Sequence, residues 1–354
     1  MNRHIKGVMV MLLSRQSTDS KQVFIWPELE KDRKLLGSKT VTIIGVGALG
    51  TVAAHHFVRT GVGNIRLVDR DFVEESNLQR QMLFDENDVK ANTPKVIAAK
   101  KKLERINSNV TIVSLIQDVN ATTIEEIVEG SDVIIDATDN METRFLINDV
   151  SVKHDIPWIY GGAIHTRGMF FSVIPGHTPC LRCLFPTSSQ NHGETCDTVG
   201  VLGPLVHIIA SYQVTEALKI LLDYKQNRNR HLNQLETWEY DFDGLPIEHS
   251  RNPNCECCVE RTFNYLNQQS NQLLISQLCG RDSIQITPTE TIRIDLKAWA
   301  KKWRPLGDVT CTPFLLRLHY QNYQLTLFQD GRLLIKGTED EREAKKLYSN
   351  LVGN

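Results

Sequence analysis

A glycine-rich turn near residue 45 constrains the fold of this chain more than any other feature. The β-branched run 41–44 leads into Gly45-x-Gly47-x-x-Gly50, and an apolar helical segment follows. The first glycine permits a tight turn, the second lets the backbone approach phosphate, and the third allows close packing of helix on strand. Backbone N–H groups at the helix start favour an anionic ligand. The pattern predicts a nucleotide-binding βαβ unit, but by itself it suits any dinucleotide enzyme.

The remaining pattern predicts an α/β fold: a Rossmann-like, mainly parallel sheet with helices on both faces, plus a small C-terminal α+β domain. We expect an N-terminal arm at 1–20, a nucleotide-binding domain with a metal site at 21–262, and the small domain at 265–354. A QDGR turn between alternating strands favours a hairpin in the last of these. The expected strands are 41–44, 65–68, 110–115, 133–137, 158–160, 169–174 and 234–242 (a pair), and the expected helices are 21–40, 85–105, 122–129 (with a capping box at Glu125), 142–153, 205–222 and 341–351.

Composition narrows the class of protein. The 354 residues suit about two domains. A net charge of −2 gives no electrostatic reason to expect nucleic acid or a membrane surface. No apolar run approaches the roughly 20 residues of a spanning helix. The first 16 residues resemble a signal peptide but lack a small-residue cleavage site, so a cytoplasmic location is expected.

Polar residues after the second predicted strand indicate what the nucleotide site does. Asp69 lies nineteen residues after Gly50, where a ribose-binding acid is expected. The run that begins Asp69-x-Asp71 continues to Asn77 and Arg80, and is too long and polar for a plain dinucleotide turn. Arg80 offers a forked donor for phosphate oxygens, which a nicotinamide enzyme would not need there.

Two further stretches add to this phosphate chemistry. Lys95 follows Pro94 at a predicted helix start and is a second candidate phosphate ligand. Asp139 follows the fourth strand, where α/β sheets gather ligands, and its carboxylate could hold Mg²⁺. Each residue alone could be a surface salt-bridge residue, but together they favour a phosphate site.

These residues carry a family resemblance. GVGALG, DRDFVEESNLQRQ, Lys95 and the TDN at 138–140 resemble the ubiquitin-activating-enzyme superfamily, in particular the bacterial MoeB/ThiF/HesA branch, over residues 21–258. Members of that branch adenylate the C-terminus of a small ubiquitin-like sulfur carrier that ends in Gly-Gly. The resemblance implies that Gly45, Gly47 and Gly50 line the ATP phosphates, that Asp69 binds ribose, that Asn77, Arg80 and Lys95 hold the polyphosphate, that Asp139 binds magnesium, and that Asp71 and Asn140 belong to the same nucleotide site.

The implied activity is ATP-dependent adenylation of a MoaD- or ThiS-like carrier, which activates it for sulfur transfer from a donor protein. Molybdopterin synthesis is the first expectation for the pathway and thiazole synthesis for thiamine the second. The nucleophile is an ionised carboxylate, so the chemistry requires cations rather than a general base. A zinc-containing NAD dehydrogenase is the alternative from another class, and it leaves Arg80 and Asp139 unexplained. A non-catalytic scaffold of the same fold is a third possibility.

The resemblance also implies a homodimer whose N-terminal arginine reaches the partner's ATP site. In this chain Lys21 holds that place by its spacing from Gly45, whereas Arg15 matches by residue type but lies six residues too early. Lysine is a weaker bidentate donor. Both assignments therefore stay open, with Lys21 preferred.

The eight cysteines fall into groups. Cys180-x-x-Cys183 and Cys255-x-x-Cys258 have the spacing of a structural, tetrahedral zinc site, with Cys257 as an alternative to Cys258. Cys196 lies in a polar loop where the family carries a cysteine that could attack the acyl-adenylate, and it is equally consistent with an inert residue. Cys279 and Cys311 are expected in the core.

The remaining segments are less informative. Arg144, His165 and Arg167 could shape the pocket or the carrier groove, but ordinary packing roles are the preferred interpretation for them. The C-terminal segment is too short for the rhodanese domain that some relatives carry. It is expected to support carrier docking or the dimer, or only to stabilise the chain.

Overall fold

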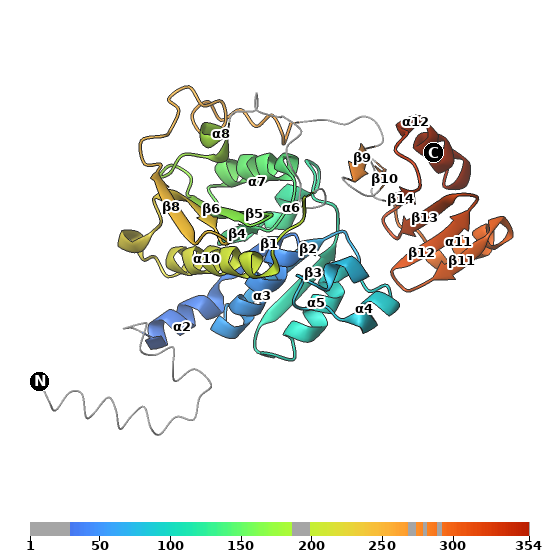
Figure 1. Ribbon diagram of the computed structural model, residues 1–354, viewed down its shortest axis with the longest axis horizontal. Coiled ribbons are helices and arrows are strands. Elements are labelled where there is room, and N and C mark those ends of the chain that lie inside the picture. The colour runs from blue at the N-terminus through green and yellow to red at the C-terminus, as the bar shows by residue number, and fades with distance from the viewer. Residues whose placement is uncertain (1–28, 186–198, 268–273, 279–281, 289–291, 354) are drawn as a thin grey trace, which may run out of the picture.

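Two β-sheets organise the protein (Figure 1). The computed structural model describes residues 29–185, 199–267, 274–278, 282–288 and 292–353. The first sheet has eight strands in the order β3-β2-β1-β4-β5-β6-β7-β8. The pairs from β3 to β5 are parallel, and those from β5 to β8 are antiparallel. The strands are β1 Thr40–Ile44, β2 Asn64–Asp69, β3 Thr111–Ile116, β4 Val133–Asp136, β5 Trp158–Ile164, β6 Arg167–Val173, β7 His231–Glu236 and β8 Asp241–Pro246.

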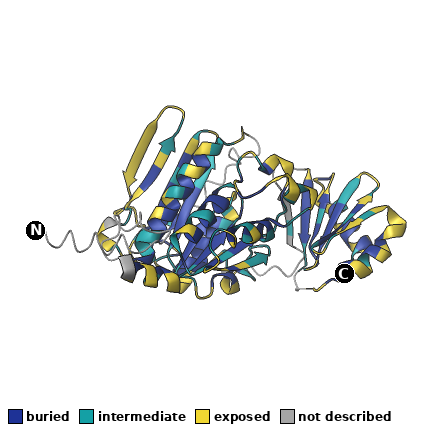
Figure 2. Ribbon diagram, turned by 90° about the horizontal axis from the view of Figure 1, so that it is seen from below, coloured by how far each residue is buried: buried dark blue, intermediate teal, exposed yellow. Residues whose placement is uncertain are grey.

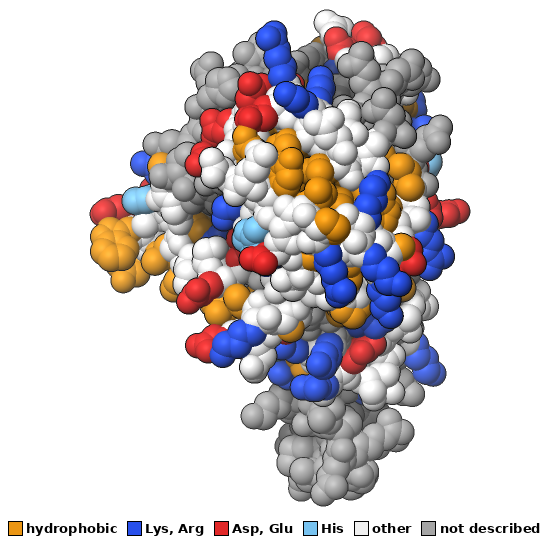
Figure 3. All heavy atoms as spheres, turned by 90° about the vertical axis from the view of Figure 1, so that its right-hand side faces the viewer, with side chains coloured by type: hydrophobic (Ala, Val, Ile, Leu, Met, Phe, Trp, Pro, Cys, Tyr) orange, Lys and Arg blue, Asp and Glu red, His pale blue; other side chains and the backbone are white. Residues whose placement is uncertain are grey.

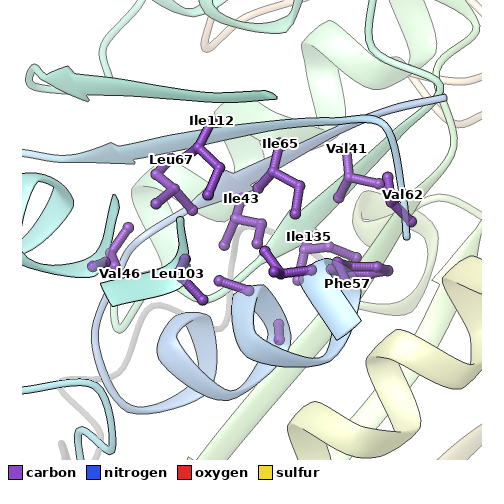
Figure 4. Packing of buried hydrophobic residues seen from close by; sticks show 14 of the residues in the cluster. Val41, Ile43, Val46, Phe57, Val62, Ile65, Leu67, Leu103, Ile112 and Ile135 are labelled. Atoms are coloured by element: carbon purple, nitrogen blue, oxygen red, sulfur yellow. The ribbon is translucent and has the colours of Figure 1, made fainter. Parts of the chain in front are cut away.

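Helices cover both faces of this sheet, as the sequence predicts, because its central strands are apolar on both sides. Val41 and Ile43 of β1 pack with Phe57 of the following helix on one face, which Figure 4 shows, and Ile44 packs on the opposite face. Helices α3, α5 and α10 contribute to the first face, and α6 and α7 to the second. The helices are α2 Leu29–Ser38, α3 Ala48–Thr60, α4 Glu86–Lys90, α5 Lys95–Leu103, α6 Ile124–Val128, α7 Met141–His154, α8 Leu181–Leu184 and α10 Gly203–Leu221, with short 3₁₀ segments η2 Glu75–Asn77 and η4 Lys225–Asn227.

Two local predictions on the helices are wrong. The single helix expected at 85–105 is two helices, because Asn92 is left-handed (φ 47°) and Pro94 lies at the N-cap of α5. Proline has no N–H to continue a helix, but it is well tolerated at a helix start. The capping box expected at Glu125 is absent: Thr123 donates to the Asp118 carbonyl at 2.9 Å, and Glu125 pairs with Lys153 instead.

The short central strand β4 is fixed at both ends by carboxylates. At its start, Asp132 accepts from the Thr40 N–H at 2.8 Å and from Lys39 Nζ at 2.7 Å. At its end, Asp136 is fully buried and bonds to Arg144. The register against β1 runs from Val41 opposite Val133 to Ile44 opposite Asp136.

The last two antiparallel strands form an exposed hairpin. Every residue of β8 is exposed, and Figure 2 shows this edge in yellow. The aromatic side chains of Trp238 and Tyr240 at the hairpin turn are 69% and 95% exposed. The expected strand pair at 234–242 is thus confirmed, with longer strands.

The second sheet forms the core of what we call the C-terminal unit, residues 274–353 without the gaps given above. Its strands lie in the order β11-β12-β13-β14-β10-β9, and all its pairs are antiparallel. The QDGR turn joins β13 to β14 as predicted, with Gly331 at φ 83°. Cys311, expected in the core, is exposed, so that prediction is wrong. The elements are β9 Leu274–Leu278, β10 Ser283–Thr287, α11 Leu296–Trp303, η5 Arg304–Leu306, β11 Asp308–Cys311, β12 Leu315–Tyr320, β13 Tyr323–Phe328, β14 Leu333–Lys336 and α12 Glu341–Leu351.

Within the described part of the chain, no helix has the length and hydropathy that crossing a bilayer requires. The face over the C-terminal unit carries side chains of both charges, with hydrophobic side chains exposed between them (Figure 3).

Candidate nucleotide site and cysteine cluster

The glycine loop has the geometry that its sequence predicts. Gly45 is left-handed (φ 91°), and a Cβ there would lie 2.5 Å from the Ala137 carbonyl oxygen. A Cβ on Gly50 would lie 2.0 Å from the Gly45 carbonyl oxygen. At Gly47 the nearest atom to such a Cβ is Nε2 of Gln81, at 3.7 Å. The first and third glycines are therefore required by packing, while the second leaves open space at the loop.

This difference predicts unequal effects of alanine in the loop. Gly50→Ala should lower the free energy of unfolding by about 1–3 kcal/mol, because the turn must move to admit the methyl group. Gly47→Ala, the matched control, should change it much less, since its Cβ meets only ordinary van der Waals contact. Urea unfolding of both variants measures the difference. Equal losses would show that the packing at Gly50 is not the cause.

Asp69 connects the glycine loop to the end of β2. Its Oδ2 accepts from the Val46 N–H at 2.7 Å, and its Oδ1 accepts from the Asp71 N–H at 2.7 Å. Burial raises the pKa of Asp69, and the nearby positive charge of Lys95 opposes that rise. The carboxylate is thus held beside the loop at the carboxyl end of a parallel strand.

Lys95 and Asp71 lie at opposite ends of the connection between β2 and α5, and the fold brings their side chains together. Lys95 Nζ lies 3.1 Å from Asp71 Oδ2, and the lysine side chain is only 6% exposed. The Lys95 N–H also donates to the Asp71 carbonyl at 3.0 Å. The sequence predicts both residues in one site, and the structure places them side by side.

Asn77 and Arg80 lie on the turn that follows. Asn77 is buried, and its Oδ1 accepts from the Glu74 N–H at 3.1 Å within the capping box of η2. Arg80 is half-buried and donates from Nη1 to the Ser76 carbonyl at 3.0 Å. Asn77 therefore shapes the turn, while the Arg80 side chain is held by the backbone carbonyl of Ser76 in the same turn.

Asp139 and Asn140 follow β4 and are exposed. The Asn140 side chain is the N-cap of α7, because its Oδ1 accepts from the Thr143 N–H at 2.9 Å. Its Nδ2 donates to Asp139 Oδ1 at 3.4 Å. Asn140 thus orients the Asp139 carboxylate at the carboxyl edge of the sheet.

Asp136 and Arg144, the latter named above as a residue that could shape the pocket, form a buried pair behind Asp139 and Asn140. Arg144 donates to Asp136 Oδ2 at 3.0 Å, and its Nη2 donates to the carbonyls of Thr138 at 2.7 Å and Gly161 at 3.0 Å. Burial raises the pKa of Asp136, and Arg144 opposes that rise. An acid that ends an apolar strand, with an arginine eight residues on, is the pattern that could have revealed the pair.

Gln81 follows Arg80 at the end of the polar run that begins at Asp69. It is buried beside Gly47, and its Oε1 has no hydrogen-bond partner within the described part of the chain. By contrast, His165 and Arg167 lie exposed at the turn between β5 and β6, and Arg167 pairs with Glu236 at 3.3 Å. Among the described residues, neither of them forms a side-chain hydrogen bond or ion pair with the glycine loop.

The four predicted cysteines form a compact cluster. The Sγ atoms of Cys180, Cys183, Cys255 and Cys258 all lie within 4.8 Å of one another. The Sγ of Cys180 lies 3.8 Å from that of Cys183 and 3.6 Å from that of Cys255, and the Sγ atoms of Cys183 and Cys258 are 3.5 Å apart. Four sulfurs at about 2.3 Å from a tetrahedral zinc ion lie about 3.8 Å apart, so the donor set and its spacing fit Zn²⁺.

Cys257 does not belong to this cluster. It is fully buried, and its Sγ accepts from Asn148 Nδ2 at 3.2 Å. The alternative in which it replaces Cys258 is therefore wrong. The Asn252 N–H donates to Cys183 Sγ at 3.4 Å, and a hydrogen bond of this kind helps to hold a thiolate in place.

Four residues named above cannot be placed. Lys21, Arg15, Cys196 and Cys279 lie outside the described residues. Their roles stay predictions.

The fold has the features of a nucleotide-binding α/β protein: a glycine loop, Lys95 and Asp139 lie around the carboxyl ends of parallel strands, and a cluster of four cysteines could hold a metal ion. The chain belongs to the ThiF family, which matches residues 20–257. The predicted MoeB/ThiF/HesA branch is thereby confirmed, as is the prediction that the protein is an adenylyltransferase.

Individual relatives refine this placement. The sulfur carrier protein ThiS adenylyltransferase of Bacillus subtilis is 39% identical over 94% of this chain and 98% of its own length. The molybdopterin-synthase adenylyltransferase of Escherichia coli is 32% identical over 64% of this chain and 89% of its own. A crystal structure of E. coli MccB with ATP has a TM-score of 0.61 at 21% identity, covering 69% of this chain and 75% of that one, and shows the shared fold. The alternative of a zinc-containing NAD dehydrogenase finds no support in these comparisons.

Proposed function

We propose that this protein uses ATP to adenylate the C-terminal glycine of a small ubiquitin-like sulfur carrier. The supporting observation is the convergence of the glycine loop, Lys95 and Asp139 at one edge of the sheet, in a chain whose relatives include adenylyltransferases for such carriers. A carboxylate oxygen of the carrier attacks the α-phosphorus of ATP and forms a new O–P bond. The bond to the β-phosphate bridging oxygen breaks, and pyrophosphate leaves.

The residues present suit this reaction because its barrier is the approach of two anions. The backbone N–H groups of the loop at Gly47 supply positive potential to the phosphates. The guanidinium of Arg80 supplies a positive charge to them. Lys95, held by Asp71, adds a cation at a fixed position. Asp139 would hold Mg²⁺ against phosphate oxygens, and Asp69 would accept from the ribose.

We further propose that the carrier is of the ThiS type, with the MoaD type as the second candidate. The sequence motifs led us to expect molybdopterin synthesis first and thiazole synthesis second, and this proposal reverses that order. The reason is coverage: the ThiS adenylyltransferase of B. subtilis matches nearly the whole chain, C-terminal unit included, whereas the E. coli molybdopterin-synthase enzyme matches 64% of it. Zinc in the cysteine cluster would be structural. A homodimer and a sulfur donor protein complete the proposal, and Lys21 or Arg15 would then act across the dimer.

Pyrophosphate exchange tests the function and the carrier together. The protein should incorporate labelled pyrophosphate into ATP when given a ThiS-type carrier, and more slowly or not at all with a MoaD-type carrier. A carrier that lacks its last glycine is the matched control and should abolish exchange, because it no longer offers the carboxylate at the right place. Exchange without any carrier would contradict the proposal, and faster exchange with the MoaD-type carrier would reverse the assignment of pathway.

A further inference from the structure

The sheet of the C-terminal unit has two unlike faces. One face is apolar and packs against α11 and α12, with Leu325 and Leu327 of β13 among its core residues. Strand residues alternate between faces, so Thr326 and Phe328 lie on the other one. The register places Arg317 opposite Thr326 and Leu315 opposite Phe328, on that same second face.

This second face is buried although its residues are largely polar. Thr326, Gln285 and Arg332 are each less than a tenth exposed, as are Leu315 and Phe328. They lie outside the core cluster that α11 and α12 complete. A polar sheet face that is buried away from its own helices is expected to pack on another part of the protein.

The structure shows one such contact directly. The ring of Phe328 stacks on the ring of Phe72, with centroids 5.4 Å apart and planes inclined by 25°. Within the C-terminal unit, the guanidinium of Arg332 lies 4.7 Å from the centre of the same Phe328 ring, and its Nε donates to Asp330 at 2.6 Å. The Phe328 ring is thus held from its own unit and presented to Phe72.

Arg317 lies on the same sheet face as Phe328, and its charge interacts with the segment that holds Phe72. Arg317 is half-buried, and burial lowers its pKa while the negative charge of Glu74 opposes that lowering. The Glu74 carboxylate is therefore within electrostatic range of Arg317. Phe72 and Glu74 lie two residues apart, so both contacts reach the same short segment.

That segment carries the candidate nucleotide residues. Phe72 bridges to Pro94, and the Val73 N–H donates to the Thr93 carbonyl at 3.0 Å, next to the bond between Lys95 and Asp71. Glu74 is the N-cap of η2, which leads to Arg80. A shift at Phe72 or Glu74 would therefore move residues on both sides of the proposed phosphate site.

We infer that the C-terminal unit positions the segment 71–80 for ATP, and that Phe328 and Arg317 are positioning residues for the nucleotide site. The inference rests on the proposed function, because that function assigns the segment to ATP. It gives the C-terminal unit a role that is distinct from carrier docking, since both residues act through Phe72 and Glu74.

Direct binding of Mg·ATP by calorimetry, without carrier, tests this inference. Phe328→Ala should raise the Kd for ATP about two- to tenfold, the range that an aromatic pair of about 0.5–1.5 kcal/mol corresponds to. Phe72→Ala should do the same, and the double variant should be no weaker than either single one, because each removes the same stack. Independent, multiplicative effects would overturn the role of the stack.

The charge contact has its own test. Arg317→Ala should raise the KM for ATP in pyrophosphate exchange with little change in kcat, and Arg317→Lys should restore most of the affinity by keeping the charge. Leu325→Val on the opposite face is the matched control: it lowers the stability of the unit but should leave the Kd unchanged. If Leu325→Val weakens ATP binding as much as Phe328→Ala, general destabilisation explains the effect and the inference fails.

The two proposals can fail separately. A wild-type protein that does not bind ATP would refute the proposed function and this inference with it. A wild-type protein that binds ATP and exchanges pyrophosphate, with unchanged constants in Phe328→Ala and Arg317→Ala, would refute the inference alone.

Discussion

Replacing Arg80 with alanine is expected to reduce adenylate formation about 10²–10³-fold, the usual cost of losing one donor that stabilises transition-state charge. Arg80 suits this test because its side chain donates to the Ser76 carbonyl of the same turn and forms no ion pair with the other described residues. Lys95 is a poorer choice: it is buried against Asp71, so its removal would leave a carboxylate uncompensated and destabilise the fold as well.

Single-turnover formation of the acyl-adenylate, with carrier and ATP saturating, measures the effect on the chemical step. Arg80→Lys keeps the charge but loses the forked geometry, so an intermediate rate is expected. Arg105→Ala, on an exposed arginine after α5, is the matched control and should keep the wild-type rate. An Arg80→Ala variant within about threefold of the wild type would remove Arg80 from the proposed site.

Replacing Cys183 with serine is expected to abolish zinc binding and to lower the midpoint of thermal unfolding by about 6 °C or more. A loss of about 3 kcal/mol or more corresponds to such a shift at roughly 2–4 °C per kcal/mol for a domain of this size, and structural zinc sites contribute several times that amount in small domains. The cluster joins the segment at α8 to the segment at 255–258, and Arg182 beside it pairs with Glu256. Loss of the metal should therefore release both segments together.

Two further cysteine-to-serine variants distinguish the effect of losing the metal from the effect of losing a thiol. Cys257→Ser lies in the same Cys-Glu-Cys-Cys run but outside the cluster, so one zinc per chain should remain. Cys311→Ser, on an exposed residue, should change neither the zinc content nor the stability. Zinc content by elemental analysis and thermal unfolding by circular dichroism are the measurements. Full zinc occupancy in Cys183→Ser would contradict the four-cysteine assignment.

The parts that could be predicted from sequence are those where local chemistry leaves few alternatives. Glycine is required at Gly45 and Gly50 because a Cβ there would lie less than 3 Å from a backbone carbonyl oxygen. The two Cys-x-x-Cys pairs come together in one cluster. The alternation of apolar runs and helices indicates the parallel half of the first sheet. Asp71 follows the end of β2 and Lys95 begins α5, so the pair lies at the two ends of one connection.

The parts that were missed depend on three-dimensional neighbours. Asp136 and Arg144 become a pair only when β4 and α7 meet, and Cys257 is excluded from the metal site only by its contact with Asn148. Asn140 is the N-cap of α7, and the sequence around it also supports that role. The assignment of Asn140 to the nucleotide site left this local role out. The stack of Phe72 on Phe328 joins residues more than 250 positions apart, which no local pattern indicates.

The two carboxylates that flank β4 have a consequence for folding. Four residues of backbone pairing alone would tolerate sliding by one position, with each side chain then facing the wrong layer. Here a slide would simultaneously strip Asp132 of the Thr40 N–H and withdraw Asp136 from a buried guanidinium. The strand is therefore held in register at both ends. As a result, the exposed Asp139, three residues beyond the strand, has a defined position relative to the sheet before any nucleotide binds.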